Sequence, residues 1–257
     1  MLKNKIPGLV LRLLYPPVCP FCGMPVRAPG SEPDGICPQC RSIVPVVSEP
    51  FCLKCGKPID DDESEYCYDC GREHHAYEQG RALYPHTDPM KQAVYDLKYA
   101  GRRVNGEIFG RELAAHFSGW IRARNITLVV PVPLHRRRLA QRGYNQAAVI
   151  AEAMVSAMYG RSGGRDAYPV PILETDVLKR ARATRRLKTM DRTGRQHALE
   201  GVFEADLTAV APALRKNVLL IDDIYTTGST IDAAAKCLKR AGAEKIYFLT
   251  VTIGRGS

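Results

Sequence analysis

Short apolar runs alternate with longer segments of helical periodicity through the C-terminal two thirds of the chain. Two runs rich in β-branched residues, 128–133 and 218–221, have the composition of strands that are buried on both faces of a parallel sheet. A third run, 246–251, follows a helical segment that ends at Gly242, a residue suited to the left-handed turn that closes many helices. Helical spacing of apolar residues is found in four segments: 89–98, 104–122, 145–158 and 230–241. The alternation predicts an α/β fold, in which a mainly parallel sheet is flanked by helices.

The first third of the chain has a different pattern, with few long apolar runs, many Pro and Gly residues, and eight of the nine cysteines. The repeat C-x-x-C-G-x-P occurs twice, beginning at Cys19 and, 33 residues later, at Cys52. The eight cysteines form four Cys-x-x-Cys pairs: Cys19/Cys22, Cys37/Cys40, Cys52/Cys55 and Cys67/Cys70. This spacing predicts a duplicated zinc ribbon with two Cys₄ sites, because a unit of about 22 residues buries too little surface to fold without a metal.

Two alternatives to this assignment remain open at the level of sequence. A disulfide framework requires an oxidising compartment, which the lack of a signal peptide disfavours. Cross-braced pairing of the four motifs is less consistent with the internal repeat than two sequential sites are.

Gly23 and Gly56 follow the second cysteine of their pairs, where a zinc knuckle turns through positive φ to direct backbone N–H groups at sulfur. We expect His74 and His75 to be exposed linker residues, and Cys237 to be a buried, unreactive thiol on a helix.

Charge divides along the same line as cysteine. The chain has 37 Lys and Arg against 27 Asp and Glu, a net charge of +10, but residues 1–77 hold eight basic and ten acidic side chains. The positive excess therefore lies in the remainder of the chain, mostly within residues 125–151 and 178–197.

We expect an N-terminal amphipathic helix and double zinc ribbon at 1–76 and an α/β domain at 77–257. No apolar run reaches the roughly 18 residues that cross a bilayer, and the first fifteen residues lack a cleavage site, so we expect a cytoplasmic protein with no membrane span.

The most specific segment of the chain is VLLIDDIYTTGST, from Val218 to Thr230. An apolar strand delivers Asp222 and Asp223, and a loop of hydroxyl residues around Gly228 then opens a helix. The unpaired N–H groups and the dipole at a helix N-terminus bind phosphate. Carboxylates repel phosphate, so the aspartates are expected to face hydroxyl groups or a cation. A ribose that carries a 5-phosphate satisfies both halves of the motif.

This segment resembles the phosphoribosyl pyrophosphate (PRPP) signature of type I phosphoribosyltransferases. Together with the Cys-x-x-Cys ribbons, it makes the whole chain similar to the ComF family of competence-associated proteins. Further family-like positions are Leu14–Pro17, Leu97–Tyr99, Gly101, Pro131–Arg138, Arg142–Gln146, Leu178, Arg180, Thr184, Arg195 and Phe203. The sequence departs from the pattern at Leu187 and Ala198, where similar proteins tend to have Gln and Asn. These departures bear on the basic loop of 179–195, which resembles a flexible loop that closes over pyrophosphate, and not on the fold.

The resemblance implies a type I phosphoribosyltransferase fold and a set of site residues. Cleavage at C1 of PRPP builds positive charge on the ribose and negative charge on pyrophosphate, which Mg²⁺ and basic side chains stabilise. The catalytic candidates are Asp222, Asp223, Arg136 and Arg137, with Asp223 as the candidate proton acceptor. The cofactor-binding candidates are Asp222, Asp223, Thr226, Thr227, Gly228, Ser229, Thr230, Lys98 and Arg142. The expected cofactors are Mg with PRPP and two structural Zn ions, bound by Cys19, Cys22, Cys37, Cys40, Cys52, Cys55, Cys67 and Cys70.

Two functions of different classes fit this sequence. The first is Mg-dependent transfer of a phosphoribosyl group to an unidentified acceptor. The second, implied by the ComF resemblance, is a nucleic-acid-binding accessory that handles single-stranded DNA during natural transformation, with PRPP or a ribose-5-phosphate-bearing nucleotide as a ligand and a DNA-uptake helicase or other competence proteins as partners. The basic stretches suit a nucleic acid. Single-strand binders add stacking aromatics, but only Tyr144 lies near the basic runs, and Phe117 and Trp120 are expected in a helix core.

Overall fold

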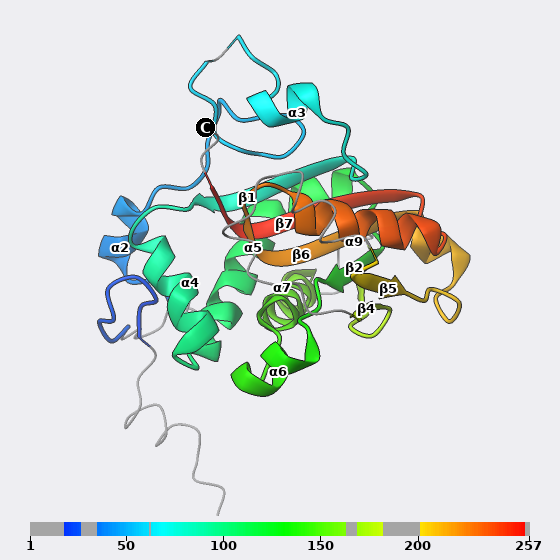
Figure 1. Cartoon of the computed structure of the whole chain (residues 1–257). Coiled ribbons are helices and arrows are strands. Elements are labelled where there is room, and N and C mark those ends of the chain that lie inside the picture. Colours follow the sequence, from blue (N-terminus) through cyan, green and yellow to red (C-terminus); the bar gives the residue numbers. More distant parts are fainter. Residues whose placement is uncertain (1–17, 27–34, 62, 163–168, 182–200, 255–257) are drawn as a thin grey trace, which may run out of the picture.

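The computed structural model describes residues 18–26, 35–61, 63–162, 169–181 and 201–254. Within these residues, a five-stranded sheet has helices on both faces, and a Cys-rich region lies at one edge of the sheet (Figure 1). The predicted N-terminal helix and the two departures from the family pattern, Leu187 and Ala198, lie outside the described residues.

The order of strands in the sheet is β1-β7-β6-β2-β3, and every neighbouring pair is parallel. Strands β4 and β5 form a separate antiparallel pair. The strands are β1 (Gln79–Pro85), β2 (Leu128–Pro131), β3 (Ile172–Leu173), β4 (Leu178–Arg180), β5 (Phe203–Ala205), β6 (Asn217–Tyr225) and β7 (Lys245–Ile253). The helices are α2 (Pro38–Ile43), α3 (Tyr68–Arg72), α4 (Met90–Tyr99), α5 (Arg103–Ala123), α6 (Arg136–Arg142), α7 (Gln146–Ser162), α9 (Ser229–Arg240) and the 3₁₀ helix η2 (Pro212–Arg215). The predicted α/β class with a mainly parallel sheet is confirmed.

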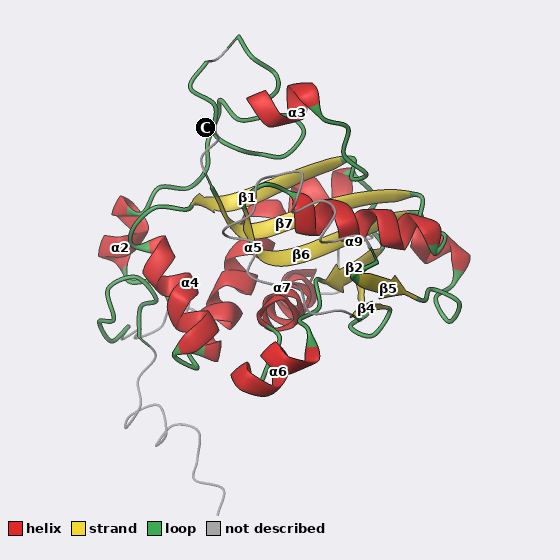
Figure 2. Cartoon of the chain, viewed as in Figure 1, coloured by secondary structure: helices red, strands yellow, loops and turns green. Residues whose placement is uncertain are grey.

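Helices cover both faces of the sheet (Figure 2), and side chains that alternate along the strands pack on each face. Leu219 and Ile221 of β6 pack in one cluster with residues of α4, α5 and α7, whereas Leu220 packs in a second cluster with residues of α9, β4 and β5. This arrangement is typical of parallel sheets, whose crossover helices cover both faces. Because β2 and β6 are neighbours, their carboxyl ends lie side by side, and ligands of open α/β sheets bind at such ends.

Strand β6 is longer than its apolar run predicts. The sequence indicates a strand over 218–221, but pairing with β7 continues past Asp222 and Asp223 to Tyr225, which lies opposite Ile253. The two aspartates are therefore part of the strand and do not follow it. Strand β7 has nine residues, and its hydrogen bonds to β6 outweigh the low strand propensity of Asp. Tertiary structure thus overrides the local preference of these residues.

The Cys-rich region consists of two ribbons that pack on opposite faces of the sheet. Ribbon 1, described over 18–26 and 35–44, belongs to the same core cluster as α4, α5 and α7. Ribbon 2, residues 51–72 without residue 62, contributes cysteines to the cluster on the α9 face and stands above the sheet in Figure 1. The double zinc-ribbon region expected at the N-terminus is thus present, and each ribbon shares a core with the sheet.

Strand β1 lies at the edge of the sheet, and the Cys-rich region covers it. The segment between the ribbons runs along β1, where the Val47 N–H donates to the Leu83 carbonyl at 2.8 Å. The Gly80 N–H donates to the Lys54 carbonyl of ribbon 2, also at 2.8 Å. An uncovered edge strand is a template for aggregation, so the ribbons protect the sheet as well as binding metal. The predicted domain boundary after residue 76 stays a prediction, because packing is continuous across it.

Candidate functional site

Each group of four cysteines has the dimensions of a tetrahedral zinc site. The four Sγ atoms of each group lie within 4.8 Å of one another. The Sγ atoms of Cys22 and Cys37 are 3.7 Å apart, as are those of Cys55 and Cys67. Zinc bound to four thiolates at about 2.3 Å separates neighbouring sulfur atoms by about 3.8 Å, so both groups fit a structural zinc ion. The ligand sets are sequential: Cys19, Cys22, Cys37 and Cys40, then Cys52, Cys55, Cys67 and Cys70.

The same tight hairpin brings the first cysteine pair into each site. Gly23 and Gly56 have φ values of +73° and +78°, which confirms the predicted turn through positive φ. The Gly23 N–H donates to the Cys19 carbonyl at 2.9 Å, and the Gly56 N–H donates to the Cys52 carbonyl at 2.8 Å. The second pair of each site lies at the start of a short helix, α2 or α3. The sequence repeat is therefore a repeat of structure.

A cleft of about 770 Å³ opens at the carboxyl ends of β2 and β6 and adjoins a second cavity of about 640 Å³. The predicted residues that line the cleft are Lys98, Arg142, Asp222, Asp223, Thr226 and Thr230. Thr227, Gly228 and Ser229 line the adjoining cavity, which shares Lys98 with the cleft. The fold thus brings residues from α4, α6 and the end of β6 to one place.

Asp222 and Asp223 are adjacent in sequence but have different surroundings. Side chains alternate along a strand, so Asp223 turns toward α4, where its Oδ1 is 2.7 Å from the Lys98 Nζ. The Asp222 Oδ1 accepts a hydrogen bond from the Asp223 N–H at 2.8 Å, and the charges of Lys98 and Arg180 both act on this carboxyl group. Burial, and secondly the charge of Asp223, raise the pKa of Asp222 to about 7. The pair therefore combines an ion-paired carboxylate with one that titrates near neutral pH.

The loop of residues 226–230 leads into the N-terminus of α9 and depends on Gly228. This glycine has a φ of +78°, and a Cβ at its position would overlap the Tyr225 hydroxyl. No side chain of the described residues caps α9, so the N–H groups of its first turn face the loop. The Thr227 and Ser229 hydroxyls lie 2.9 Å apart in the same loop. Backbone donors, hydroxyls and the helix dipole together suit a phosphate group.

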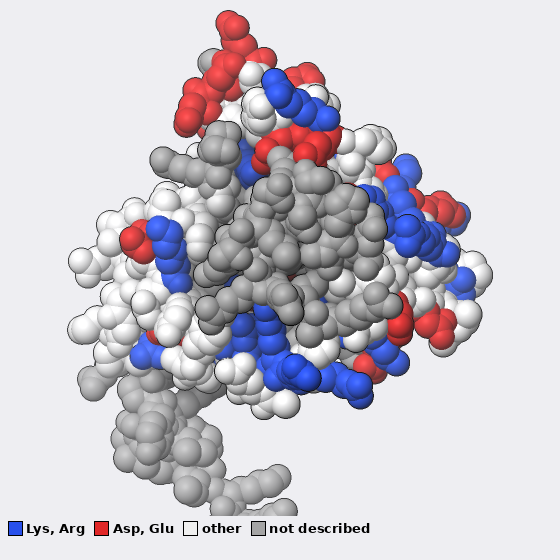
Figure 3. Space-filling model, viewed as in Figure 1, with Lys and Arg blue, Asp and Glu red and all other residues white. Residues whose placement is uncertain are grey.

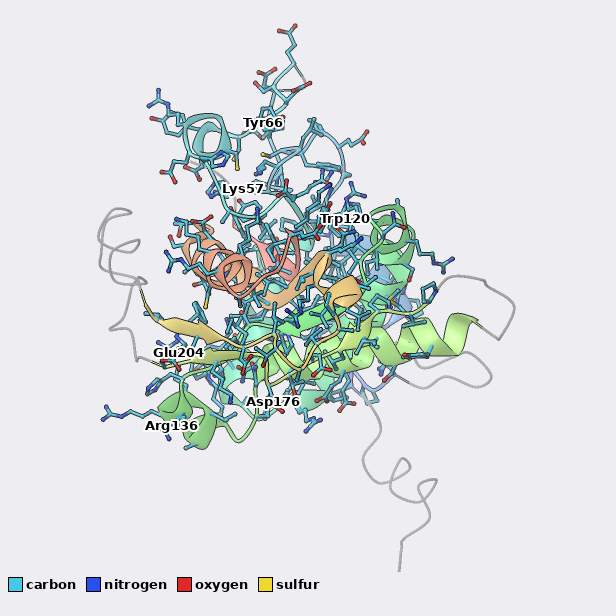
Figure 4. All side chains as sticks on the ribbon, turned by 90° about the vertical axis from the view of Figure 1, so that its right-hand side faces the viewer. Lys57, Tyr66, Trp120, Arg136, Asp176 and Glu204 are labelled. Carbon is cyan, nitrogen blue, oxygen red and sulfur yellow. The ribbon has the colours of Figure 1, made fainter. Side chains whose placement is uncertain are left out.

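Basic residues divide between the cleft and the outer surface. Arg138 and Arg142 of α6 and Arg180 of β4 line the cleft. Arg136 and Arg137 are exposed and line neither cavity, and Arg136 extends away from the fold (Figure 4). Successive residues of an α-helix are about 100° apart, so three consecutive arginines do not share a face. The structure therefore places Arg138, and not the two arginines predicted as catalytic, beside the aspartates.

Comparisons with known proteins cover both the ribbons and the cleft. The family model of the double zinc ribbon domain matches residues 10–71. Competence protein ComFC of Bacillus subtilis (strain 168) is 28% identical over 80% of this chain and 79% of its own. Competence protein F of Haemophilus influenzae is 23% identical over 83% of this chain and 88% of its own. The DNA utilization protein YhgH of Escherichia coli (strain K12) is 24% identical over 91% of this chain and 96% of its own.

The relatives and the ribbon match together support a ComF family assignment. The ribbon match contains all eight cysteines of the two Cys₄ groups, and the relatives are similar over most of the sheet domain as well. In the part of the chain that the structure describes, no helix combines the length and the apolar character needed to cross a membrane.

Ribbon 1 is fixed to α5 by an ion pair. The Arg41 guanidinium of α2 donates to both carboxylate oxygens of Glu112, at 2.8 and 3.1 Å, and the Glu112 side chain is buried. Phe21, between two zinc ligands, packs edge-on against Tyr84 of β1 with ring centroids 5.7 Å apart. The first metal site is therefore held against the helical face of the sheet by both charge and apolar contact.

Ribbon 2 is joined to the loop of residues 226–230 through the segment that follows the ribbon. The Tyr77 and Tyr225 hydroxyls are 2.7 Å apart, and both side chains are buried. The Ala76 N–H donates to the Asp232 carboxylate, in the first turn of α9, at 2.6 Å. Lys57 of ribbon 2 lies where the ribbon meets the sheet domain (Figure 4), with its Nζ 5.9 Å from the centre of the Tyr225 ring. The element that precedes loop 226–230 thus contacts the second ribbon directly.

Three residues outside the motifs, His74, His75 and Cys237, can be compared with their predicted burial. The prediction that His75 is exposed is wrong: its ring is buried, stacks on Tyr77 with centroids 4.8 Å apart, and places Nδ1 3.7 Å from an Asp232 oxygen. The reason is docking onto α9, which the sequence does not reveal; His74 is exposed as predicted. Cys237 is half-buried, and burial raises the pKa of its thiol, as expected for an unreactive side chain.

Several residues of the cleft carry no recognisable motif. Tyr95 and Tyr99 of α4 line both cavities, and the Arg142 guanidinium lies over the Tyr99 ring, so the prediction that only Tyr144 lies near the basic runs is wrong in three dimensions. Their spacing of four residues is a signal, since it places both rings on one side of a helix. His86 follows β1 and lines the smaller cavity, where burial lowers its pKa, helped by Lys98. These residues reach the site through the fold of β1 and α4.

Proposed function

We propose that this ComF chain binds PRPP with magnesium in the cleft and transfers the phosphoribosyl group to an acceptor, in a process that handles incoming DNA. The relatives support the link to DNA, since they are named as competence and DNA utilization proteins. One observation carries the proposal: an aspartate pair, a phosphate-type loop and a group of basic side chains lie together at the ends of β2 and β6.

These three groups match the three parts of PRPP. The loop of 226–230 and the α9 N-terminus suit the 5-phosphate. Asp222 and Asp223 accept hydrogen bonds, as the ribose hydroxyls require. Arg138 and Arg142 lie on the β2 side of the cleft, where they supply positive charge to pyrophosphate. Because developing charge in the transition state sits at the ribose and the leaving group, the same placement favours bond cleavage.

Magnesium fits this cleft as an ion that enters with pyrophosphate. Protein-bound Mg²⁺ in such sites is held by one or two carboxylates, with phosphate oxygens and water as the other ligands. Asp222 and Asp223 are the carboxylates that line the cleft, and Asp223 is already 2.7 Å from Lys98. When bound, the ion supplies positive charge that offsets the charge of the departing pyrophosphate.

Isothermal titration of PRPP with Mg²⁺ tests the binding site. The double variant Asp222→Asn and Asp223→Asn should weaken PRPP binding by at least about tenfold, because hydrogen bonds to charged acceptors contribute about 1.5 to 3 kcal/mol each. The control variant Asp176→Asn and Glu204→Gln makes the same change in net charge at exposed positions that line neither cavity (Figure 4). Equal PRPP affinity in both variants would show that the cleft is not the site.

Release of pyrophosphate tests turnover. PRPP and Mg²⁺ are incubated with the protein and a panel of bases, nucleotides and single-stranded DNA. An acceptor that stimulates release supports transfer, and loss of that release in the aspartate variant ties it to the cleft.

The alternative function is a non-catalytic nucleic-acid-binding or regulatory protein that uses the PRPP site only as a ligand pocket. The specific observation in its favour is the basic surface over α6, where Lys and Arg side chains gather outside the cleft (Figure 3). PRPP binding without pyrophosphate release for every acceptor would favour this alternative. In that case Arg136→Gln with Arg137→Gln should reduce the salt dependence of binding to single-stranded DNA.

A further inference from the structure

Tyr95 and Tyr99 form an exposed aromatic surface beside the cleft, which we call the tyrosine shelf. Their side chains are 56% and 60% exposed. Helix α4 packs onto the sheet domain through its other side, which consists of Met90, Ala93, Val94 and Leu97. That apolar side accounts for the stability of the helix, and the two tyrosines add little to it. Their exposure in a cleft is therefore better explained by a ligand than by folding.

The two rings of the shelf lie close together but are tilted and not stacked on each other. The two ring centroids are 4.9 Å apart with an angle of 45° between the rings. The Arg142 guanidinium lies 4.8 Å from the centre of the Tyr99 ring, which places a cation of α6 against the same surface. Both rings line the cleft and the adjoining cavity, together with Lys98, whose Nζ pairs with Asp223. The shelf is thus continuous with the proposed PRPP site.

Planar aromatic faces beside positive charge are the chemistry that recognises unpaired nucleobases. Stacking of a base on an aromatic side chain contributes about 1 to 3 kcal/mol and needs no particular sequence. Lys91, Arg138 and Arg142 line the same cavities and complement the phosphates of a strand. A duplex hides the faces of its bases, so this surface selects single strands.

We propose that the tyrosine shelf binds single-stranded nucleic acid, with unpaired bases stacked on Tyr95 and Tyr99 and the adjacent phosphates held by Arg142. This inference rests on the proposed function in that both use one cleft, and it deepens that function by naming the second ligand of the site. It also brings a nucleobase next to the aspartate pair, at the place where an acceptor of the phosphoribosyl group is required.

Fluorescence anisotropy with a labelled thymidine oligonucleotide measures this interaction. The double variant Tyr95→Ala and Tyr99→Ala should weaken binding by roughly tenfold or more, because at least one stacked base is lost. The slope of affinity against salt should stay unchanged, since stacking releases no counterions, whereas Arg142→Gln should reduce that slope. The matched control is Tyr159→Ala on α7, whose side chain is 59% exposed and lines neither cavity. The oligonucleotide as a duplex and thymidine monophosphate serve as competitors and should compete poorly.

The variants Tyr95→Phe and Tyr99→Phe keep both aromatic faces, and they should retain binding. Loss of affinity in the alanine variant together with retention in the phenylalanine variant supports the shelf. Equal affinity of the alanine variant and the Tyr159→Ala control overturns it, as does loss in the phenylalanine variant. PRPP titration of the same proteins separates the two proposals: the alanine variant should still bind PRPP, and the Asp222→Asn, Asp223→Asn variant should still bind the oligonucleotide. Failure of PRPP binding in the wild type, with strand binding intact, refutes the proposed function and leaves the shelf standing.

Discussion

The hydrogen bond between Tyr77 and Tyr225 joins the end of the Cys-rich region to the strand that carries the aspartates. We expect its loss to lower the free energy of unfolding of the chain. The two hydroxyls are 2.7 Å apart, and the side chains are 0% and 3% exposed. Burial raises the pKa of both phenols, so each stays protonated at any ordinary pH and one donates to the other. The substitution Tyr77→Phe removes one hydroxyl and keeps the ring, whose edge-on contact with Phe248 has a centroid distance of 4.9 Å.

The size of the destabilisation depends on the hydroxyl group that stays buried after the substitution. In Tyr77→Phe, the Tyr225 hydroxyl stays buried without this partner, which costs about 1 to 3 kcal/mol. For a chain of this size, the melting temperature should fall by roughly 2 to 4 °C for each kcal/mol. The double variant Tyr77→Phe with Tyr225→Phe removes both polar groups and should be destabilised by about 1 kcal/mol or less. The two single effects should therefore be far from additive.

Urea unfolding with saturating zinc measures the free energy of unfolding of the wild type, both single variants and the double variant. Tyr159→Phe, at an exposed position on α7, controls for loss of a tyrosine hydroxyl and should leave stability unchanged. Simple addition of the two single effects in the double variant would show that the hydroxyls contribute independently, and it would refute a stabilising hydrogen bond between them.

Four further predictions address the metal sites, the docking of ribbon 1, the loop and the titration of the cleft. The protein should contain two zinc ions by native mass spectrometry, and chelation should lower the melting temperature of the whole chain, because each ribbon shares a core with the sheet. Arg41→Ala should reduce the free energy of unfolding by about 1 to 3 kcal/mol in urea, since it leaves the buried Glu112 carboxylate without this cation, and Arg41→Ala with Glu112→Leu should recover part of the loss. Gly228→Ala should weaken PRPP binding by roughly tenfold or more in calorimetry because of its positive φ, whereas Gly160→Ala, in open space on α7, should not. The pKa of Asp222 is about 7 in the folded state and near 3.8 in the unfolded state, so between these pH values the folded state binds more protons. The free energy of unfolding should therefore fall as pH rises from about 4 to 7, by up to about 1.4 kcal/mol per pH unit. An Asp222→Asn variant with the same pH profile as the wild type would contradict this expectation.

The features that the sequence predicted correctly depend on residues close together in the chain. The Cys-x-x-Cys spacing and the glycine that follows it define each zinc knuckle locally, and both glycines have the expected positive φ. The alternation of apolar runs and helical segments predicted a parallel sheet with helices on both faces, since each pattern is set by the period of its own element. Loop 226–230 and the aspartates that precede it are contiguous, so they enter the cleft together.

The remaining features were decided by contacts between distant segments. Pairing with β7 extends β6 through the aspartates, and the alternation of the strand then gives Asp222 and Asp223 different partners. The docking of α6 determines that Arg138, and not Arg136, reaches the cleft. Helix phase and docking likewise bring Tyr95 and Tyr99 to the same opening.

The sequence by itself therefore determined which chemical groups this chain contains: two Cys₄ sets, a phosphate-type loop, an aspartate pair and an excess of positive charge. The tertiary structure decided which of these groups meet, how deeply each is buried, and that both ribbons complete the core of the sheet. The physical reason is the separation in sequence of the residues that interact. Backbone turns and the spacing of metal ligands follow from neighbouring residues. Burial, ion pairs and shared cavities depend instead on elements that are distant in sequence and adjacent only after folding.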